Sequence, residues 1–465
     1  MPYIGRAPTA SITKLEDADQ DTKIQVEESS DEDIIRFDIA GAEDFTMTAN
    51  TFTAAASSIV ALDDGAVGTP ALTNTGDLNT GVYFPAADTV GVVSGGTEQF
   101  RFGSNPIPGG SKNLIQNGSM TVNQRGTTTA QGDGGKATDR WVMSFFAGTE
   151  EARYTLSQDS SAPVGFSYSY KVDCTTAESA VAAGEALVLQ QMIEAQNLQH
   201  LAYGNAAAKT CTLSFWVKSP KTGQHGVSIY VPDGSRGIHS TYTIASADTW
   251  EYFTWTFAGD TSGTINNDTG IGFNVRFCLY SGSTYDSDTL DTWSGSQFVA
   301  GTSQVNTMDN TANNFYLTGV QLEVGSVATD FAHEDYGTTL NKCKRYYQII
   351  LAGPNVRSSP YTGDPAEMIY QVSGTAGEQM IRLQPEMRAI PTSQLSSAAH
   401  IGVEVGDIGS KTSTTCTSAA FESGYVYTGQ LWTRVGWSGS TGDKGDMARA
   451  FVQDSDCLWA LSAEL

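Results

Sequence analysis

Residues 1–110 hold too few large apolar side chains to build a core of their own, and this limits what the whole chain can become. Thr and Ala are frequent in this region, and no long amphipathic pattern runs through it. Lys23–Val26 and Ile34–Ile39 alternate apolar with polar residues, which predicts two half-buried strands. So little apolar surface does not offset the ordering entropy of a single chain. We therefore expect an obligate oligomer in which strands of neighbouring copies share a core.

A weak internal similarity lies in the same region. Gly41–Met47 and Gly96–Phe102 each place a glycine at a turn and alternating apolar residues after it. Two tandem β units would explain the similarity, and a chance match would explain it equally well. Residues 104–111, with two prolines and two glycines, then predict a linker.

The middle of the chain, residues 112–335, has the strand-and-turn pattern of one large β domain. Strands separated by turn residues at this spacing predict a β-sandwich or jelly roll. The segment Leu187–Leu201 fits either a short helix or a strand with a loop. The clearest strand patterns are Cys211–Val217, His225–Val231, Trp250–Phe257 and Gly272–Tyr280.

The last part of the chain begins with apolar residues at helical spacing, which predicts a connecting helix over 336–347. Residues 348–465 then return to strand patterns and form a C-terminal β domain. Two polar stretches, Gly409–Ser418 and Ser438–Asp446, are interpreted as exposed loops. The chain thus divides into 1–103, the linker 104–111, and the domains 112–335 and 348–465 joined by the helix. Candidate C-terminal strands are Tyr370–Val372, Ile381–Leu383, Tyr425–Tyr427, Leu431–Val435 and Ala448–Val452.

Composition excludes several functions. Lys and Arg number 26 against 51 Asp and Glu, a net charge of −25, so a basic nucleic-acid-binding face is not expected. No run of about 18 apolar residues predicts a membrane span, and the N-terminus lacks a signal-peptide pattern. Six separated cysteines without a CxxC pair give no zinc pattern, and we favour free buried thiols over disulfides.

No catalytic motif is present, so we expect a protein that is not an enzyme and binds no cofactor and no metal. The five histidines lie beside neither a nucleophile elbow nor an HExxH motif. Asp286–Asp291 resembles a calcium loop but lacks the glycine and glutamate of an EF-hand. Gly259–Gly270 also carries acidic residues, and in both segments a solvated loop is favoured over a metal site.

Aromatic residues near the C-terminus are the candidates for a receptor or glycan site. Sugar rings stack on Trp and Tyr, and polar loop residues bind their hydroxyls. Trp437, at a loop edge, is expected to be exposed, with Tyr361, Asp443 and Asp446 as further candidates. Core packing is the competing interpretation, and we expect it for Tyr425, Tyr427 and Trp432.

Several collinear segments resemble tail-fibre proteins of marine tailed bacteriophages. The resemblance implies an elongated all-β homotrimer, with an N-terminal hairpin-rich attachment region, a central jelly roll of carbohydrate-binding type and a C-terminal β domain at the tip. It places the protein in the virion tail after assembly in the host cytoplasm. The segments are Gly76–Val90, Gly95–Phe102, Lys112–Arg125, Thr138–Trp141, Asn314–Gly325, Asp330–Phe331, Cys343–Tyr347 and Pro385–Thr392.

The partners implied by the resemblance are other copies of the chain, tail proteins at the N-terminal region, and a host surface glycan or protein at the C-terminal domain. Three other functions stay open. A tailspike depolymerase would cut host polysaccharide, although no β-helix period is present here. A capsid fibre or decoration protein would have the same composition, and a secreted cell-wall-binding protein would need an export signal.

Overall fold

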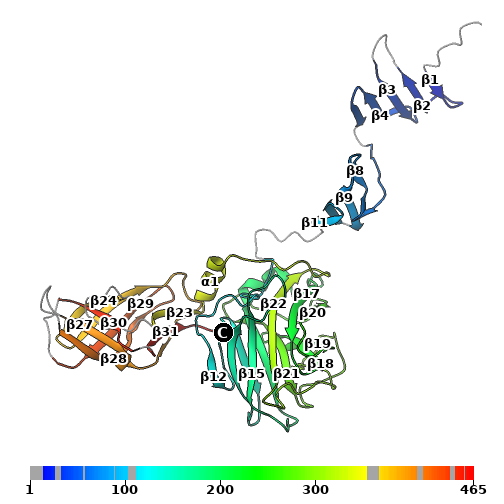
Figure 1. Cartoon of the computed structure of the whole chain (residues 1–465). Coiled ribbons are helices and arrows are strands. Elements are labelled where there is room, and N and C mark those ends of the chain that lie inside the picture. Colours follow the sequence, from blue (N-terminus) through cyan, green and yellow to red (C-terminus); the bar gives the residue numbers. More distant parts are fainter. Residues whose placement is uncertain are drawn as a thin grey trace, which may run out of the picture. The chain divides into compact units, whose positions relative to one another are not determined.

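The computed structural model describes residues 14–26, 33–55, 58–87, 89–102, 112–352, 366–405, 412–439, 446–454 and 456–465. The expected linker at 104–111 lies outside these residues. The chain divides into two units, Met1–Pro108 and Gly109–Leu465. In both units nearly all of the regular secondary structure is β-strand, as the sequence predicted (Figure 1). Within the described residues, no helix has the length and apolar character that a membrane span needs.

The first unit consists of small sheets, and the five-stranded one has no second layer among the described residues. A five-stranded meander comes first, in the order β1-β2-β3-β4-β5. A short pair β6-β7 and a four-stranded sheet β11-β10-β9-β8 follow. The strands are β1 Lys14–Glu16, β2 Lys23–Val26, β3 Ile35–Ile39, β4 Ala42–Thr48, β5 Thr51–Ala54, β6 Gly65–Ala66, β7 Thr69–Pro70, β8 Leu72–Asn74, β9 Asp77–Ala86, β10 Thr89–Ser94 and β11 Thr97–Phe102.

These sheets leave apolar side chains in contact with solvent. Leu15 is 68% exposed, Ile24 46% and Phe52 53%, although all three lie in strands. A sheet that has one apolar face needs another layer to cover it. The described part of a single chain supplies no such layer here.

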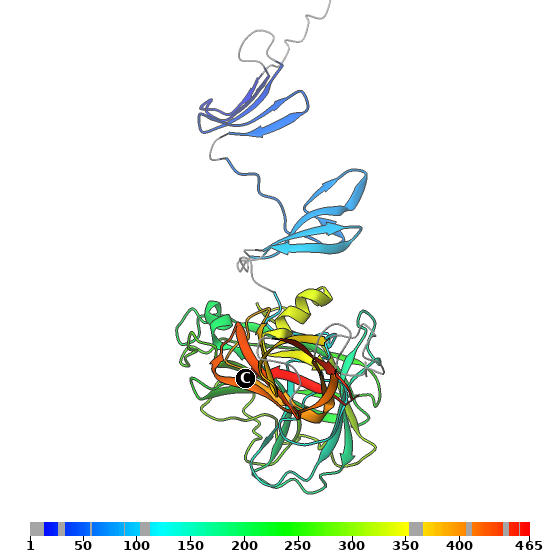
Figure 2. The same cartoon turned by 90° about the vertical axis from the view of Figure 1, so that its left-hand side faces the viewer.

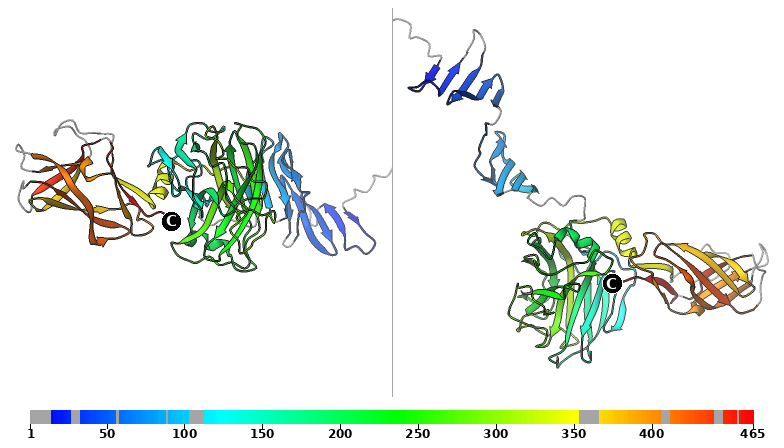
Figure 3. Two further views of the ribbon diagram at one scale, coloured as in Figure 1. Left: turned by 90° about the horizontal axis from the view of Figure 1, so that it is seen from below. Right: turned by 180° about the vertical axis from the view of Figure 1, so that it is seen from behind.

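The second unit begins with a two-layer jelly roll (Figure 3). A six-stranded antiparallel sheet, β12-β14-β15-β22-β17-β20, packs on a five-stranded one, β13-β16-β21-β18-β19. The strands are β12 Thr128–Gln131, β13 Trp141–Phe146, β14 Arg153–Asp159, β15 Ser169–Thr176, β16 Ala186–Glu194, β17 Cys211–Lys218, β18 Gly223–Val231, β19 Arg236–Ile244, β20 Glu251–Phe257, β21 Ile271–Ser281 and β22 Asn314–Val324.

Period-2 alternation decides which side chains enter the jelly-roll core. Leu213 and Phe215 on β17 are buried among the residues between the two sheets, while Trp216 points to the other face. The segment 187–201, for which the sequence left helix and strand open, contains one of each. Strand β16 is followed directly by the 3-10 helix η1, Ala195–Leu201. All six cysteines are buried and form no disulfide.

The C-terminal part follows helix α1, Tyr336–Lys344, which lies inside the segment expected to be helical. The strands of the C-terminal part form a three-stranded sheet, β23-β31-β26, and a closed six-stranded barrel, β24-β25-β29-β28-β27-β30. The barrel faces the viewer in Figure 2. The elements are β23 Tyr347–Ala352, β24 Ala366–Ser373, β25 Ala376–Arg382, β26 Thr392–Leu395, η2 Ala398–His400, β27 Ile401–Val405, β28 Thr412–Val426, β29 Gln430–Trp437, β30 Met447–Val452 and β31 Leu458–Ser462.

One sequence expectation fails in the barrel. Gly409–Ser418 was predicted to be an exposed loop, but its described part, from Thr412, is the beginning of β28. The stretch is rich in Thr, and β-branched side chains favour the extended backbone of a strand even where the composition is polar.

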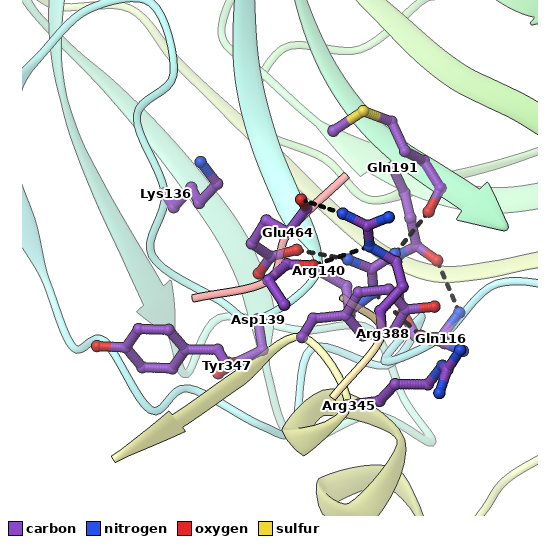
Figure 4. Close-up of polar contacts among 12 residues, drawn as sticks. Gln116, Lys136, Asp139, Arg140, Gln191, Arg345, Tyr347, Arg388 and Glu464 are labelled. Carbon is purple, nitrogen blue, oxygen red and sulfur yellow. Dashed lines mark hydrogen bonds and ion pairs between the residues drawn. The ribbon is translucent and has the colours of Figure 1, made fainter. Parts of the chain in front are cut away.

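Buried charges join the jelly roll to the C-terminal strands (Figure 4). The Glu464 carboxylate accepts hydrogen bonds from Arg125 at 2.9 Å and Arg140 at 2.5 Å, and Arg125 also pairs with Asp139 at 3.2 Å. The Arg140 guanidinium lies 3.3 Å from the centroid of the Tyr346 ring. Burial alone would raise the pKa of Glu464, but Arg140 and Arg125 hold it below the usual value. We call Arg125, Asp139, Arg140 and Glu464 the junction cluster.

Candidate functional site

An open cleft lies on the outward face of the six-stranded sheet. It has a volume of about 620 Å³ and crosses strands β17, β20 and β22. Two loop segments form its walls. Residues 164–166 precede β15, and residues 327–333 follow β22. We call it the aromatic cleft because its lining includes Phe166, Trp216, Tyr252, Phe331 and His333.

The strand alternation supplies the floor of the aromatic cleft. Trp216 on β17 and Tyr252 on β20 are cross-strand partners with ring centroids 5.1 Å apart. Tyr252 is 45% exposed and Trp216 is half-buried, although the other aromatic residues of β20 point into the core or pack against it. Ser214 and Thr254, which are also partners, continue the same face with hydroxyl groups.

A bulge in β22 lets the wall come close to the floor. The register between β17 and β22 shifts between Ser214 and Trp216, and Gly319 has a positive φ of 61° there. A Cβ atom at Gly319 would lie 2.8 Å from Phe166 and 2.9 Å from Trp216. Only glycine therefore allows the Phe166 ring to stand beside the indole.

The aromatic wall is held by ring contacts. The rings of Phe166 and Phe331 pack edge to face with their centroids 5.0 Å apart. The centroid of the His333 ring lies 5.3 Å from that of Phe166 and 4.9 Å from that of Phe331. The edge-to-face pairs Phe166–Phe331 and Phe331–His333 have a favourable arrangement for aromatic rings. The wall can therefore keep its shape before a ligand arrives.

Buried polar side chains of β22 fix the second wall segment. The Glu323 carboxylate accepts hydrogen bonds from the Thr329 backbone N–H at 2.9 Å and from its hydroxyl at 2.6 Å. Gln321 accepts a hydrogen bond from the Ala332 N–H at 2.8 Å. Asp330, between them, is exposed and also lines the aromatic cleft. The cleft thus joins rigid aromatic faces with a carboxylate and hydroxyl groups.

More aromatic and basic side chains lie beyond the cleft on the same sheet face. The Tyr316 and Trp250 rings are 6.2 Å apart, and the Lys218 ammonium lies 4.1 Å from the Tyr316 centroid. Lys218 is two residues along β17 from Trp216 and therefore on the same face. An aromatic surface longer than the cleft itself runs across this sheet.

Of the four residues that the sequence suggested for a site, the structure describes Trp437 and Asp446. The expected exposure of Trp437 is wrong, since it is 3% exposed and packs in the barrel core beside Val435. Asp446 is exposed, while Tyr361 and Asp443 lie outside the described residues. Tyr427, expected to be buried, is 51% exposed.

The acidic loops that resembled metal sites use their carboxylates within the protein. Asp260 pairs with Arg236, Asp288 accepts hydrogen bonds from Thr302, and Asp291 accepts one from the Trp255 indole at 2.7 Å. Another acidic group gathers at a turn among the described residues, with Asp17, Asp19 and Asp21 all exposed. Exposed acidic turns are common without any ion.

The aromatic cleft was missed because its residues come from separate parts of the sequence. One signal was available. Trp250, Tyr252 and Thr254 alternate with Phe253 and Trp255, so the strand carries aromatic rings on both faces. A strand at the edge of a sandwich needs only one aromatic face for the core.

No family model matches the chain. No curated protein matches it either. Solved structures similar to it include the enzymatically active domain of bacteriophage CBA120 tailspike protein 4, at 15% identity and a TM-score of 0.25, with 46% of this chain and 22% of that one covered. The chain thus covers about a fifth of that structure.

Two further similar structures are described as sugar-binding. A putative sugar-binding protein from Bacteroides thetaiotaomicron is 13% identical, with a TM-score of 0.26 and coverage of 46% of this chain and 100% of that one. A family 11 carbohydrate-binding module from Clostridium thermocellum is 14% identical, with a TM-score of 0.23 and coverage of 43% and 95%. Each similarity extends over less than half of this chain.

Proposed function

We propose that this chain is a phage tail-fibre protein that attaches the virion to its host by binding a surface glycan in the aromatic cleft. The observation that carries the glycan-binding part is the pairing of the half-buried Trp216 ring and the exposed Tyr252 ring with a wall of Phe166, Phe331 and His333.

The chemistry of the aromatic cleft suits a saccharide. Sugar rings present apolar C–H faces that stack on Trp and Tyr, and their hydroxyls need hydrogen-bonding groups at the rim. Ser214, Thr254 and Asp330 supply such groups beside the rings. A volume of about 620 Å³ lies within the usual range for sites of small ligands. The additional rings of Trp250 and Tyr316 would extend contact to a longer glycan chain.

Binding without cleavage is the favoured activity, so the protein is proposed not to be an enzyme. Glycoside hydrolysis commonly uses two carboxyl groups on opposite sides of the scissile bond. Asp330 is the single acidic residue among the described residues that line the aromatic cleft. A depolymerase would release oligosaccharides from host polysaccharide, and an adhesive fibre would not.

Assembly as a homotrimer through the N-terminal unit is supported by its five-stranded sheet, which has no second layer among the described residues. Apolar side chains such as Leu15 and Phe52 are exposed in the described part of one chain. Strands of neighbouring copies would cover them and so form the shared core that the sequence requires. The placement of this unit on the phage tail rests on the sequence resemblance, and a capsid fibre is the second candidate.

The test is glycan binding by matched aromatic variants. Trp216→Ala should weaken binding of host surface polysaccharide about fivefold, because a lost aromatic stack costs about 1 kcal/mol. Tyr427→Ala removes an exposed ring of the C-terminal barrel and serves as the control. Binding would be measured by biolayer interferometry on immobilised polysaccharide, with circular dichroism to verify folding. Loss of binding in Tyr427→Ala alone would move the site to the barrel and refute the proposal.

A further inference from the structure

A row of side chains continues the face of the aromatic cleft across the six-stranded sheet. Lys218 on β17 is the cross-strand partner of Tyr316 on β22, and Tyr316 is in turn the partner of Lys171 on β15. Trp250 lies directly before β20, on the other side of Lys218. Lys218 is two residues along β17 from Trp216 in the cleft, and so on the same face. We call Trp250, Lys218, Tyr316 and Lys171 the lysine row. All four are half-buried, so each keeps part of its surface in contact with solvent.

Lys218 carries a charge that its protein neighbours do not neutralise. Its ammonium lies 4.1 Å from the Tyr316 ring centroid and 5.5 Å from that of Trp250, within the range of cation–π contact. One of its N–H groups donates a hydrogen bond of 2.6 Å to Ser161 Oγ. In the described parts of the chain, no carboxylate comes within ion-pair distance of Lys218. An ammonium has three donors, so two remain available to a ligand.

The acidic groups beside the lysine row are engaged by other donors. Asp173 pairs with Lys171 at 3.1 Å, and Asp159 accepts a hydrogen bond of 2.7 Å from the Ser161 backbone N–H. In a chain with 51 acidic and 26 basic residues, a lysine without a counter-charge that is held between two aromatic rings needs an explanation. An anion that arrives from solvent and fits beside the rings would supply the missing charge.

We propose that Lys218 binds the carboxylate of an acidic sugar in a glycan that also occupies the aromatic cleft. The ammonium would donate charge-assisted hydrogen bonds to the carboxylate, and the Ser161 hydroxyl, which accepts from Lys218, would donate another. The faces of Trp250 and Tyr316 would stack on the sugar ring. This inference rests on the proposed function and adds the charge of the ligand.

The charges along this face also set the order of the sugars. Asp330 is an exposed carboxylate in the wall of the aromatic cleft, where it would repel an acidic sugar. Lys218 lies outside the residues that line the cleft. The glycan should therefore place a neutral sugar on Trp216 and Tyr252 and an acidic sugar beside Lys218.

The test uses the full-length chain and two forms of the host surface polysaccharide. One form is native and the other is carboxyl-reduced, so the two differ in charge and keep the same linkages. Lys218→Met removes the ammonium and keeps a flexible, unbranched side chain. Lys221→Met is the matched control, because Lys221 lies three residues beyond Lys218 and pairs with Asp309. Biolayer interferometry would measure binding at low and at high salt concentration, and circular dichroism would verify folding.

The natural chain should bind the native polysaccharide about tenfold more tightly than the reduced one, as expected for a hydrogen bond between charged groups. High salt should weaken binding of the native form alone. Lys218→Met should bind the native form about tenfold more weakly and the reduced form unchanged. Lys221→Met should bind both forms as the natural chain does.

Two results would overturn the proposal. Equal affinity of the natural chain for the two forms would do so whether or not the variant folds. Unchanged binding of the native form by Lys218→Met, or an equal loss in Lys221→Met, would show that this lysine does not hold the carboxylate.

Failure of this inference and failure of the proposed function give different results. Trp216→Ala should weaken binding of both forms, because the aromatic cleft takes a neutral sugar. If both forms bind the natural chain equally and Trp216→Ala weakens both, the aromatic cleft stands and the acidic ligand is refuted. If neither form binds the natural chain, the proposed function fails and this inference fails with it.

Discussion

The junction cluster makes a quantitative prediction for Glu464→Gln. Glu464 sits between Arg125 and Arg140, whose side chains are 9% and 1% exposed. Removing the carboxylate leaves two nearly buried guanidinium groups with Asp139 as the one remaining counter-charge in the junction cluster. Breaking a buried ion pair in this way costs about 3 kcal/mol or more. Because Arg140 keeps its hydrogen bonds to Gln116 and to the Met192 carbonyl, we expect a loss of stability of about 3 kcal/mol, the lower end of this range.

Calorimetry of the full chain measures this cost. A loss of about 3 kcal/mol lowers the melting temperature by about 4 °C in a cooperative unit of this size, given about 2 cal/mol/K of unfolding entropy per residue. Glu378→Gln is the matched control, because its ion pair with Arg434 is partly exposed to solvent and should contribute less than about 0.5 kcal/mol. Equal melting temperatures for Glu464→Gln and the natural chain would refute the ion-pair reasoning.

The pH dependence of the same variant has a definite sign. The pKa of Glu464 in the folded protein is held below its usual value. Its contribution to the free energy of unfolding is therefore complete above the ordinary Glu pKa of about 4.3, and it disappears as the pH falls through the lower pKa of the folded state. Asp139 acts in the opposite direction, because burial raises its pKa and its charged form is disfavoured. The difference in stability between the natural chain and Glu464→Gln should therefore shrink below about pH 4. A difference that stays constant into acid would assign the cost to packing.

Three further predictions test other parts of the structure. Deleting residues 1–103 should leave a folded chain that no longer forms a trimer or joins the particle. Light scattering should give a native mass of about three times 49.4 kDa for the full chain and not for the truncated one. A trimeric truncated chain would be inconsistent with N-terminal assembly. Trp437→Ala should destabilise the barrel by about 3 kcal/mol or more through loss of core packing, as measured by denaturant unfolding; an unchanged midpoint would mean the indole is not core. The buried thiols should not react with Ellman's reagent at pH 8 in the native state, since burial raises the pKa of Cys211 to about 12 and of Cys174 to about 11; fast labelling of the native chain would contradict this.

The strands that the sequence predicted well are those with clean alternation. Cys211–Val217 and His225–Val231 each lie within one strand, because every second residue enters a single large core. The same period-2 rule, applied along β29, predicts that Trp437 is buried. It is in phase with Leu431, Thr433 and Val435, all of which are buried. Its position beside a Gly- and Ser-rich stretch suggested exposure, but the period-2 pattern decides its face.

The aromatic cleft was beyond single-sequence reasoning because Phe166 and Phe331 are far apart in the chain and meet only through the fold. Local patterns report which face of a strand is buried, not which loops cover it.

The most direct test of the account is a structure of the chain with an oligosaccharide from its host's surface bound. The account predicts a sugar ring stacked on Trp216 and Tyr252, with its hydroxyls near Asp330 and Thr254. A saccharide bound only on the C-terminal barrel, with the aromatic cleft empty, would contradict it.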